Sequence, residues 1–123
     1  MWDVVFYASV TGREPVKELM AKVLDEGQLA KLRERLVSLE EHGPAMKDEY
    51  PKALKQLTGR RHRCLYELRI AKDQLRIFLF FHEDMAVLVH GITKAGKGHK
   101  KIRTQYDTAL ARRDDWLQRR SGR

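Results

Sequence analysis

The chain has 123 residues, one cysteine and a formal net charge of +8 at pH 7. This length suits a single domain with its own core, and the lone Cys64 excludes an internal disulfide and is typical of a reducing cytoplasm. The N-terminal segment contains Asp3 and no basic region, which argues against a signal peptide, and no apolar run approaches the ~20 residues of a membrane span. We therefore expect a cytoplasmic domain with no membrane contact.

The basic excess is confined to one part of the chain. Residues 1–50 contain 7 Lys/Arg and 10 Asp/Glu, a net charge of −3, whereas residues 51–123 contain 18 and 7, a net charge of +11. Such asymmetry indicates a polyanionic partner, and nucleic acid is the leading candidate. The alternative is a solvated basic face that only keeps the protein soluble.

The first half of the chain predicts a strand followed by two helices. Residues 2–8 are aromatic and β-branched, as in a strand, and Pro15 suits the first turn of a helix whose apolar residues recur at helical spacing through Leu24. A second amphipathic helix is expected over about residues 28–41, ended by Gly43 and Pro44. We expect the two helices to form a hairpin on one sheet face.

The second half predicts most of the sheet and one more helix. A short strand is expected at residues 53–57, within a polar connection. Three antiparallel strands with short polar turns follow, over residues 63–71, 75–81 and 85–92. A basic, glycine-rich loop over 94–101 precedes a final helix over 102–118. The predicted fold is a single α+β domain with a small twisted antiparallel sheet.

Two arginines lie in neighbouring strands of this predicted sheet. If Ile70 pairs with Leu75, the apolar residues of both strands share one face, and Arg69 lies directly opposite Arg76 on the other. Like charges in facing positions repel each other. Either Glu67 neutralises Arg69 while Arg76 reaches solvent, or the two guanidiniums hold a phosphate between them.

Further basic residues surround this pair. If Phe81 pairs with Met85 across the next turn, Arg76 lies beside His90, although a strand histidine is more commonly part of the core. The stretch from Lys94 to Arg103 contains no acidic residue, and its glycines allow a ligand close to the backbone. The segment RRHR at 60–63 is expected to form another wall of a basic cleft.

The pattern excludes several kinds of active site and leaves one. The five histidines are scattered without metal-ligand spacing, and Cys64 lacks a catalytic partner, so we expect neither a metal nor a cofactor. A basic cleft can still cleave RNA, because the 2′-hydroxyl attacks its own phosphate once it is aligned and the developing charge is stabilised.

Five segments carry a resemblance to a known family: LTG at 57–59, LYELR at 65–69, LRIFLFF at 75–81, VLVHGITK at 87–94 and TALARRDDW at 108–116. Together they resemble the HigB-like, phage-derived branch of the RelE toxin superfamily, over about residues 54–117. The resemblance implies a RelE-like fold and a toxin that cleaves messenger RNA on the ribosome without metal. It also implies an antitoxin partner, often a helix-turn-helix DNA-binding protein.

The resemblance and the cleft together give a set of expected site residues. The functional arginines of the family match Arg69 and Arg76, and its lysine after the last strand matches Lys94; His99 is a candidate acid. The residues expected to hold RNA are Arg60, Arg61, Lys97, Lys100, Lys101 and Arg103.

Two other functions remain open at this point. The segment after Lys94 lacks the proline that the family usually has there, which favours a non-catalytic module that binds nucleic acid or a partner. A structural subunit whose basic face meets an acidic protein is the third alternative.

Overall fold

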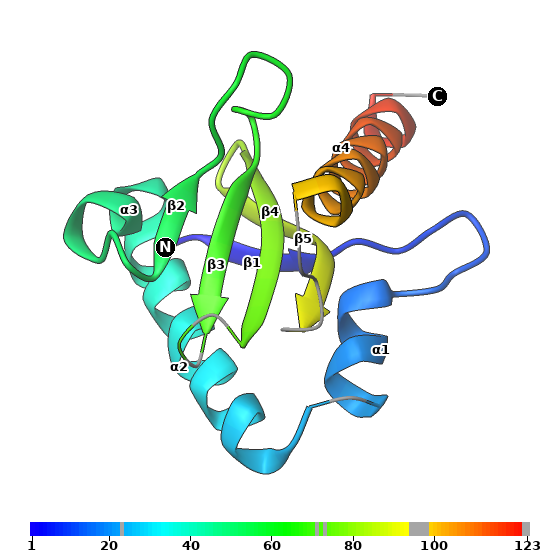
Figure 1. Cartoon of the computed structure of the whole chain (residues 1–123). Helices are drawn as coiled ribbons and strands as arrows, with labels where there is room; N and C mark the ends of the chain where they lie inside the picture. Colours follow the sequence, from blue (N-terminus) through cyan, green and yellow to red (C-terminus); the bar gives the residue numbers. More distant parts are fainter. Residues whose placement is uncertain (23, 71, 73, 94–98, 122–123) are drawn as a thin grey trace.

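A five-stranded sheet forms the centre of the fold (Figure 1), with the strand order β1-β5-β4-β3-β2. The computed structural model describes residues 1–22, 24–70, 72, 74–93 and 99–121, and no side chains at 99–101. The strands are β1 (Asp3–Phe6), β2 (Leu54–Gln56), β3 (Tyr66–Ile70), β4 (Leu75–His82) and β5 (Met85–Thr93). Strands β2 to β5 are antiparallel to their neighbours, whereas β1 pairs with β5 in parallel.

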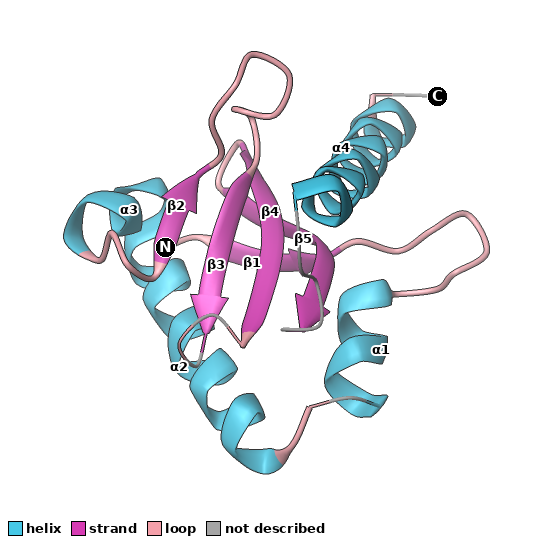
Figure 2. Ribbon diagram, in the orientation of Figure 1, coloured by secondary structure: helices cyan, strands magenta, loops and turns pink. Residues whose placement is uncertain are grey.

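Helices cover both faces of the sheet (Figure 2). They are α1 (Pro15–Lys22), α2 (Glu26–His42), the 3₁₀ turn η1 (Gly43–Ala45), α3 (Met46–Glu49) and α4 (His99–Arg120). Helices α1 and α2 pack on one face and α4 on the other. Within the described residues, no helix has the length and apolar character needed to cross a membrane.

The strand sequences supply two apolar faces because their side chains alternate. Leu68, Ile77 and Leu79 are fully buried against α1 and α2, whereas Phe78 and Phe80 point to the opposite face and are buried against α4. The α+β class and the single small sheet are thus confirmed, with the addition that the sheet is mixed.

The two N-terminal helices follow each other and pack on the same sheet face, as expected, but on different strands. They diverge from the turn that joins them (Figure 1), and α1 packs on β5 while α2 packs on β3 and β1. Residues 43–49, expected to be irregular, form η1 and α3, and α4 begins at His99, three residues earlier than predicted.

The predicted register between β3 and β4 is confirmed, and that between β4 and β5 is wrong. Ile70 pairs with Leu75, and Arg69 faces Arg76. Across the next turn, however, His82 rather than Phe81 pairs with Met85. The ladder then shifts between Phe78 and Leu79, because β5 contains one extra residue there.

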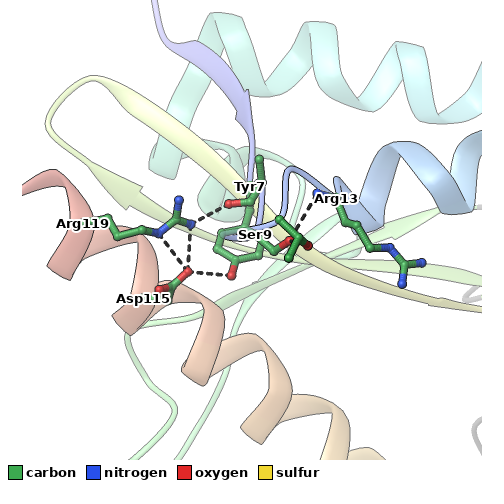
Figure 3. A network of polar contacts seen from close by, with 7 residues as sticks. Tyr7, Ser9, Arg13, Asp115 and Arg119 are labelled. Carbon is green, nitrogen blue, oxygen red and sulfur yellow. Dashed lines mark hydrogen bonds and ion pairs between the residues drawn. The ribbon is translucent and has the colours of Figure 1, made fainter.

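A polar network joins the C-terminal half of α4 to the segment after β1 (Figure 3). The Tyr7 hydroxyl donates to Oδ2 of Asp115 over 2.7 Å, and Nη2 of Arg119 donates to the same oxygen over 2.8 Å. In the same segment, the backbone N–H of Arg13 donates to Oγ of Ser9 over 3.2 Å. These bonds tie the loop that precedes α1 to the helix on the opposite sheet face.

Candidate nucleic-acid interface

The two facing arginines share one buried carboxylate. Glu67 lies on β3 with 1% of its surface exposed. Its Oε2 accepts a hydrogen bond from Nε of Arg69 over 2.6 Å, and its Oε1 lies 3.6 Å from Nη1 of Arg76. The position follows from the strand period, because residues 67 and 69 share one face and Arg76 lies across the strand pair.

The sequence left open whether Glu67 neutralises Arg69 or the two arginines hold a phosphate between them, and this geometry answers the first question. The ion pair between Glu67 and Arg69 is confirmed, and Arg76 also faces Glu67 instead of only reaching solvent. Both arginine side chains keep about a quarter of their surface exposed, at 27% and 28%. We call Glu67, Arg69 and Arg76 the arginine cluster. These three described residues carry two positive charges and one negative charge, so their net charge attracts an anion. A phosphate between the guanidiniums stays a prediction.

Tyr106 on α4 lies next to this cluster. Its ring packs edge-on against Phe78 at 5.5 Å between centroids and against the His62 ring at 5.5 Å. Burial raises the pKa of the Tyr106 phenol, Glu67 raises it further, and Arg76 and Arg69 lower it. The hydroxyl is therefore within the electric field of the arginine cluster, and it stays protonated at neutral pH.

Tyr106 also lines a polar cavity of about 430 Å³. Its wall includes Arg60 and Arg61 from the segment before β3 and Arg103 from α4, three residues predicted to hold RNA. Asp107 also lines it, with Oδ1 at 2.9 Å from Nε2 of His62. The bond from His62 lowers the pKa of Asp107, with Arg61 and Arg103 contributing. Among its described lining residues, the cavity thus has three arginine side chains and one ionised carboxylate.

Five predicted site residues lie wholly or partly outside the part of the chain that the structure describes. Lys94 and Lys97 lie outside the described residues. His99, Lys100 and Lys101 fall in the first turn of α4, and their side chains also lie outside the description. The roles predicted for these five residues stay predictions.

His90 does not lie beside Arg76, contrary to the prediction. Arg76 pairs with Ile92, and His90 faces Phe78, whose ring lies at 6.0 Å in a stacked orientation. The Nδ1 atom of His90 accepts a hydrogen bond from Nη1 of Arg112 over 2.8 Å, and its Nε2 bonds the Gln105 side chain. Burial lowers the pKa of the imidazole. His90 therefore joins β5 to α4.

The sequence analysis did not identify Tyr106 or Asp107 as site residues. A signal was present, because Arg103, Tyr106 and Asp107 follow i, i+3, i+4 spacing and so share one helix face. This helix face lies opposite the RRHR segment and forms the α4 side of the cavity.

We compared the sequence with models of protein families and with curated proteins. A model of the family described as "Phage derived protein Gp49-like (DUF891)" matches residues 18–114, which is most of the chain. The match includes the second half of α1 and all of α2, which the motifs at 54–117 did not cover, and both the arginine cluster and the polar cavity. A search of curated proteins gave no match.

Proposed function

Because the chain belongs to the Gp49-like family, a RelE-like family associated with toxin–antitoxin systems, we propose that it is a toxin that cleaves messenger RNA. Such a family implies an antitoxin partner. We further propose that the antitoxin is a helix-turn-helix protein, that the ribosome presents the message, and that the reaction takes place in the cytoplasm.

The arginine cluster is the observation that carries this proposal. Arg69 and Arg76 are held side by side by Glu67, with their outer surfaces exposed. Two adjacent guanidiniums match the oxygens of a phosphate diester. The cavity with Arg60, Arg61 and Arg103 lies next to them across Tyr106, so one RNA strand can contact both. Contacts of this kind fix the register of the strand through its phosphates.

In the proposed reaction, the 2′-hydroxyl of the RNA attacks the adjacent phosphorus, and the bond to the 5′-oxygen of the next nucleotide breaks. Arg69 and Arg76 bind the scissile phosphate and stabilise the charge that develops on its oxygens. Lys94 assists in charge stabilisation or proton transfer, and His99 is the candidate that protonates the leaving oxygen. Tyr106 lies close enough to the cluster to orient the strand.

Induced expression in bacteria tests this proposal. The wild-type chain should arrest growth and create new messenger ends, and Arg76→Ala should relieve both at an equal level of folded protein. The control is Arg33→Ala, which removes the same charge from an exposed position on α2 and should leave toxicity unchanged. Arg76→Lys separates charge from geometry, because it keeps the charge but loses the planar fork.

A non-catalytic binding module is the second candidate, and one observation favours it. Glu67 already neutralises one charge of the arginine cluster without any ligand. In this case the wild-type chain, although folded and soluble, would leave growth and messages intact. It would still bind RNA or a partner through the same arginines.

A further inference from the structure

A second basic cavity lies between α1, β5 and α4. It measures about 330 Å³ and includes Arg13, Glu18 and Lys22 on the side of α1, His90 and Gly91 on β5, and Arg112 on α4. Gly91 lets α1 approach closely, because a Cβ there would come within 2.5 Å of Cδ2 of Leu19. Arg13 belongs to the loop before α1, where its backbone N–H donates to Oγ of Ser9, as Figure 3 shows.

The charges around this cavity are unbalanced. Three cationic side chains, Arg13, Lys22 and Arg112, line it together with one carboxylate, Glu18. That carboxylate is already engaged by Arg13, whose Nη2 and Nε lie 2.7 and 3.1 Å from its two oxygens. Lys22 and Arg112 therefore have no carboxylate of their own in the described part of this cavity.

Arg112 is the unusual member of the set, because it is partly buried and bonds only neutral groups. Its Nη1 donates to the carbonyl of Val89 over 3.0 Å and to Nδ1 of His90 over 2.8 Å. No ion pair joins it to a carboxylate within the described residues. Burial lowers the pKa of the guanidinium and the charge of Glu18 raises it, so this carboxylate, which Arg13 already engages, offsets the burial only in part. A carboxylate ligand would supply the missing charge.

We propose that this cavity receives an acidic side chain from a protein partner, the antitoxin that the family implies. The site has two cations without a carboxylate partner and a guanidinium fork that matches a carboxylate geometrically. The partner that the family implies is a protein, and Asp and Glu are the anionic side chains that a protein partner can supply. Because Arg13 and Lys22 are exposed, one free carboxylate would be bound weakly, so the acid has to be part of a larger docking segment.

An NMR titration of the ¹⁵N-labelled full chain tests this site. The probes are the peptide acetyl-Glu-Glu-Glu-Glu-amide, inorganic phosphate and a short single-stranded RNA. The peptide should move the signals of the Gly91 amide and the Arg112 Nε–H and reach saturation. Lys22→Glu should weaken this binding at least about fivefold, because it reverses a charge that lines the site. Lys31→Glu, the same change on exposed α2, should alter it less than about twofold.

Each contrary outcome overturns the proposal. If the peptide moves only the signals of residues 60, 61 and 103, it binds the other cavity and not this one. If Lys31→Glu weakens peptide binding as much as Lys22→Glu does, the binding is nonspecific attraction to a basic protein. If phosphate or RNA saturates the Arg112 signal more readily than the peptide does, the cavity belongs to a free anion or to the RNA path. The proposal rests on the antitoxin partner and not on RNA cleavage. No readout here involves cleavage, so its failure and that of the nuclease proposal are distinguishable.

Discussion

Glu67 is the residue that allows two arginines to face each other across β3 and β4. Two guanidiniums in directly opposite positions repel, and the repulsion is stronger where water is partly excluded. A carboxylate between them, almost fully buried, converts the repulsion into two attractions. The chain can therefore hold two arginines at one place on the sheet, which is the property that the proposed function uses.

Replacing Glu67 with glutamine should destabilise the fold. The change keeps the size of the side chain and removes the charge that both arginines face, so we expect the free energy of unfolding to fall by roughly 2–3 kcal/mol. Urea unfolding followed by circular dichroism measures this. Glu41→Gln, an exposed position on α2, should cost less than about 0.5 kcal/mol. Equal small losses in both variants would mean that solvent already screens the arginines.

His90 is held in its neutral form by its two neighbours. Since Nδ1 accepts from Arg112, the ring proton is on Nε2 and is donated to Gln105. A second proton would break the bond from Arg112 and place two positive charges in contact. Burial acts in the same direction and lowers the pKa of His90.

The fold should therefore lose stability below about pH 6.5 through His90. Because the folded pKa is lowered, the unfolded chain binds the proton first, and the loss grows as the pH falls from the unfolded pKa to the folded one. Asp107 and Asp115 have lowered pKa values, so their losses begin only near the ordinary pKa of aspartate, about 3.9. Unfolding free energies between about pH 7.5 and 5 should slope downward in the wild type and be flatter in His90→Gln. Parallel slopes would assign the effect to other groups.

Helix α4 connects parts of the chain that are distant in sequence. It carries Tyr106 to the arginine cluster, Arg112 to β5 and Asp115 to the segment after β1. Its C-terminal half is held to the segment after β1 by the Tyr7 hydroxyl, which donates to Oδ2 of Asp115, and by Nη2 of Arg119, which donates to the carbonyl of Ala8. The position of this helix therefore decides whether the two cavities keep their shape.

Asp115→Asn should loosen the C-terminal half of α4. The variant weakens two charge-assisted bonds at a partly exposed position, so we expect a loss of about 1 kcal/mol. Hydrogen exchange should speed up in residues 112–120 and in the segment after β1. The neighbouring Asp114→Asn is the control, because Asp114 is exposed and pairs only with Arg113 in the described structure. Exchange that changes equally in both variants would argue against the anchoring role.

The sequence predicted those parts of the fold that local patterns determine. The register of β3 and β4 followed from alternation and a short turn, and so did the facing arginines. The extra residue in β5 could not be predicted, because Val89 and His90 are both compatible with a regular strand and only packing against α4 makes the irregularity favourable. The parallel pairing of β1 is likewise a long-range choice.

The candidate site was predictable to a similar extent. The arginines of the cluster and of the RRHR segment are visible as a concentration of positive charge. Tyr106 and Asp107 were not identified. Their helical spacing indicates a site only once α4 is known to face the RRHR segment. The neutral state of His90 depends on Arg112, 22 residues away, and has no local signal.

Across the whole molecule, charge and layer coincide. The helices α1 and α2, which cover one sheet face, together contain as many acidic as basic residues, whereas α4 and the RRHR segment on the other face are strongly basic. Such a division attracts a polyanion to one face and orients it before any specific contact forms. It also leaves the face covered by α1 and α2 outside the proposed RNA path.

This division predicts how RNA binding should depend on salt. If Arg60, Arg61 and Arg103 each contact a phosphate, replacing any one by alanine should reduce the slope of log K against log salt by about 0.7, the value for single strands. Fluorescence anisotropy of a short labelled RNA, between about 50 and 200 mM salt, measures the slope. Arg33→Ala on α2 removes the same net charge from the opposite layer and should leave the slope unchanged.

If all four variants reduced the slope equally, the total charge of the protein, rather than this cavity, would attract the RNA. If none did, the strand would follow another path past Arg69 and Arg76, and the cavity beside Tyr106 would need a different ligand.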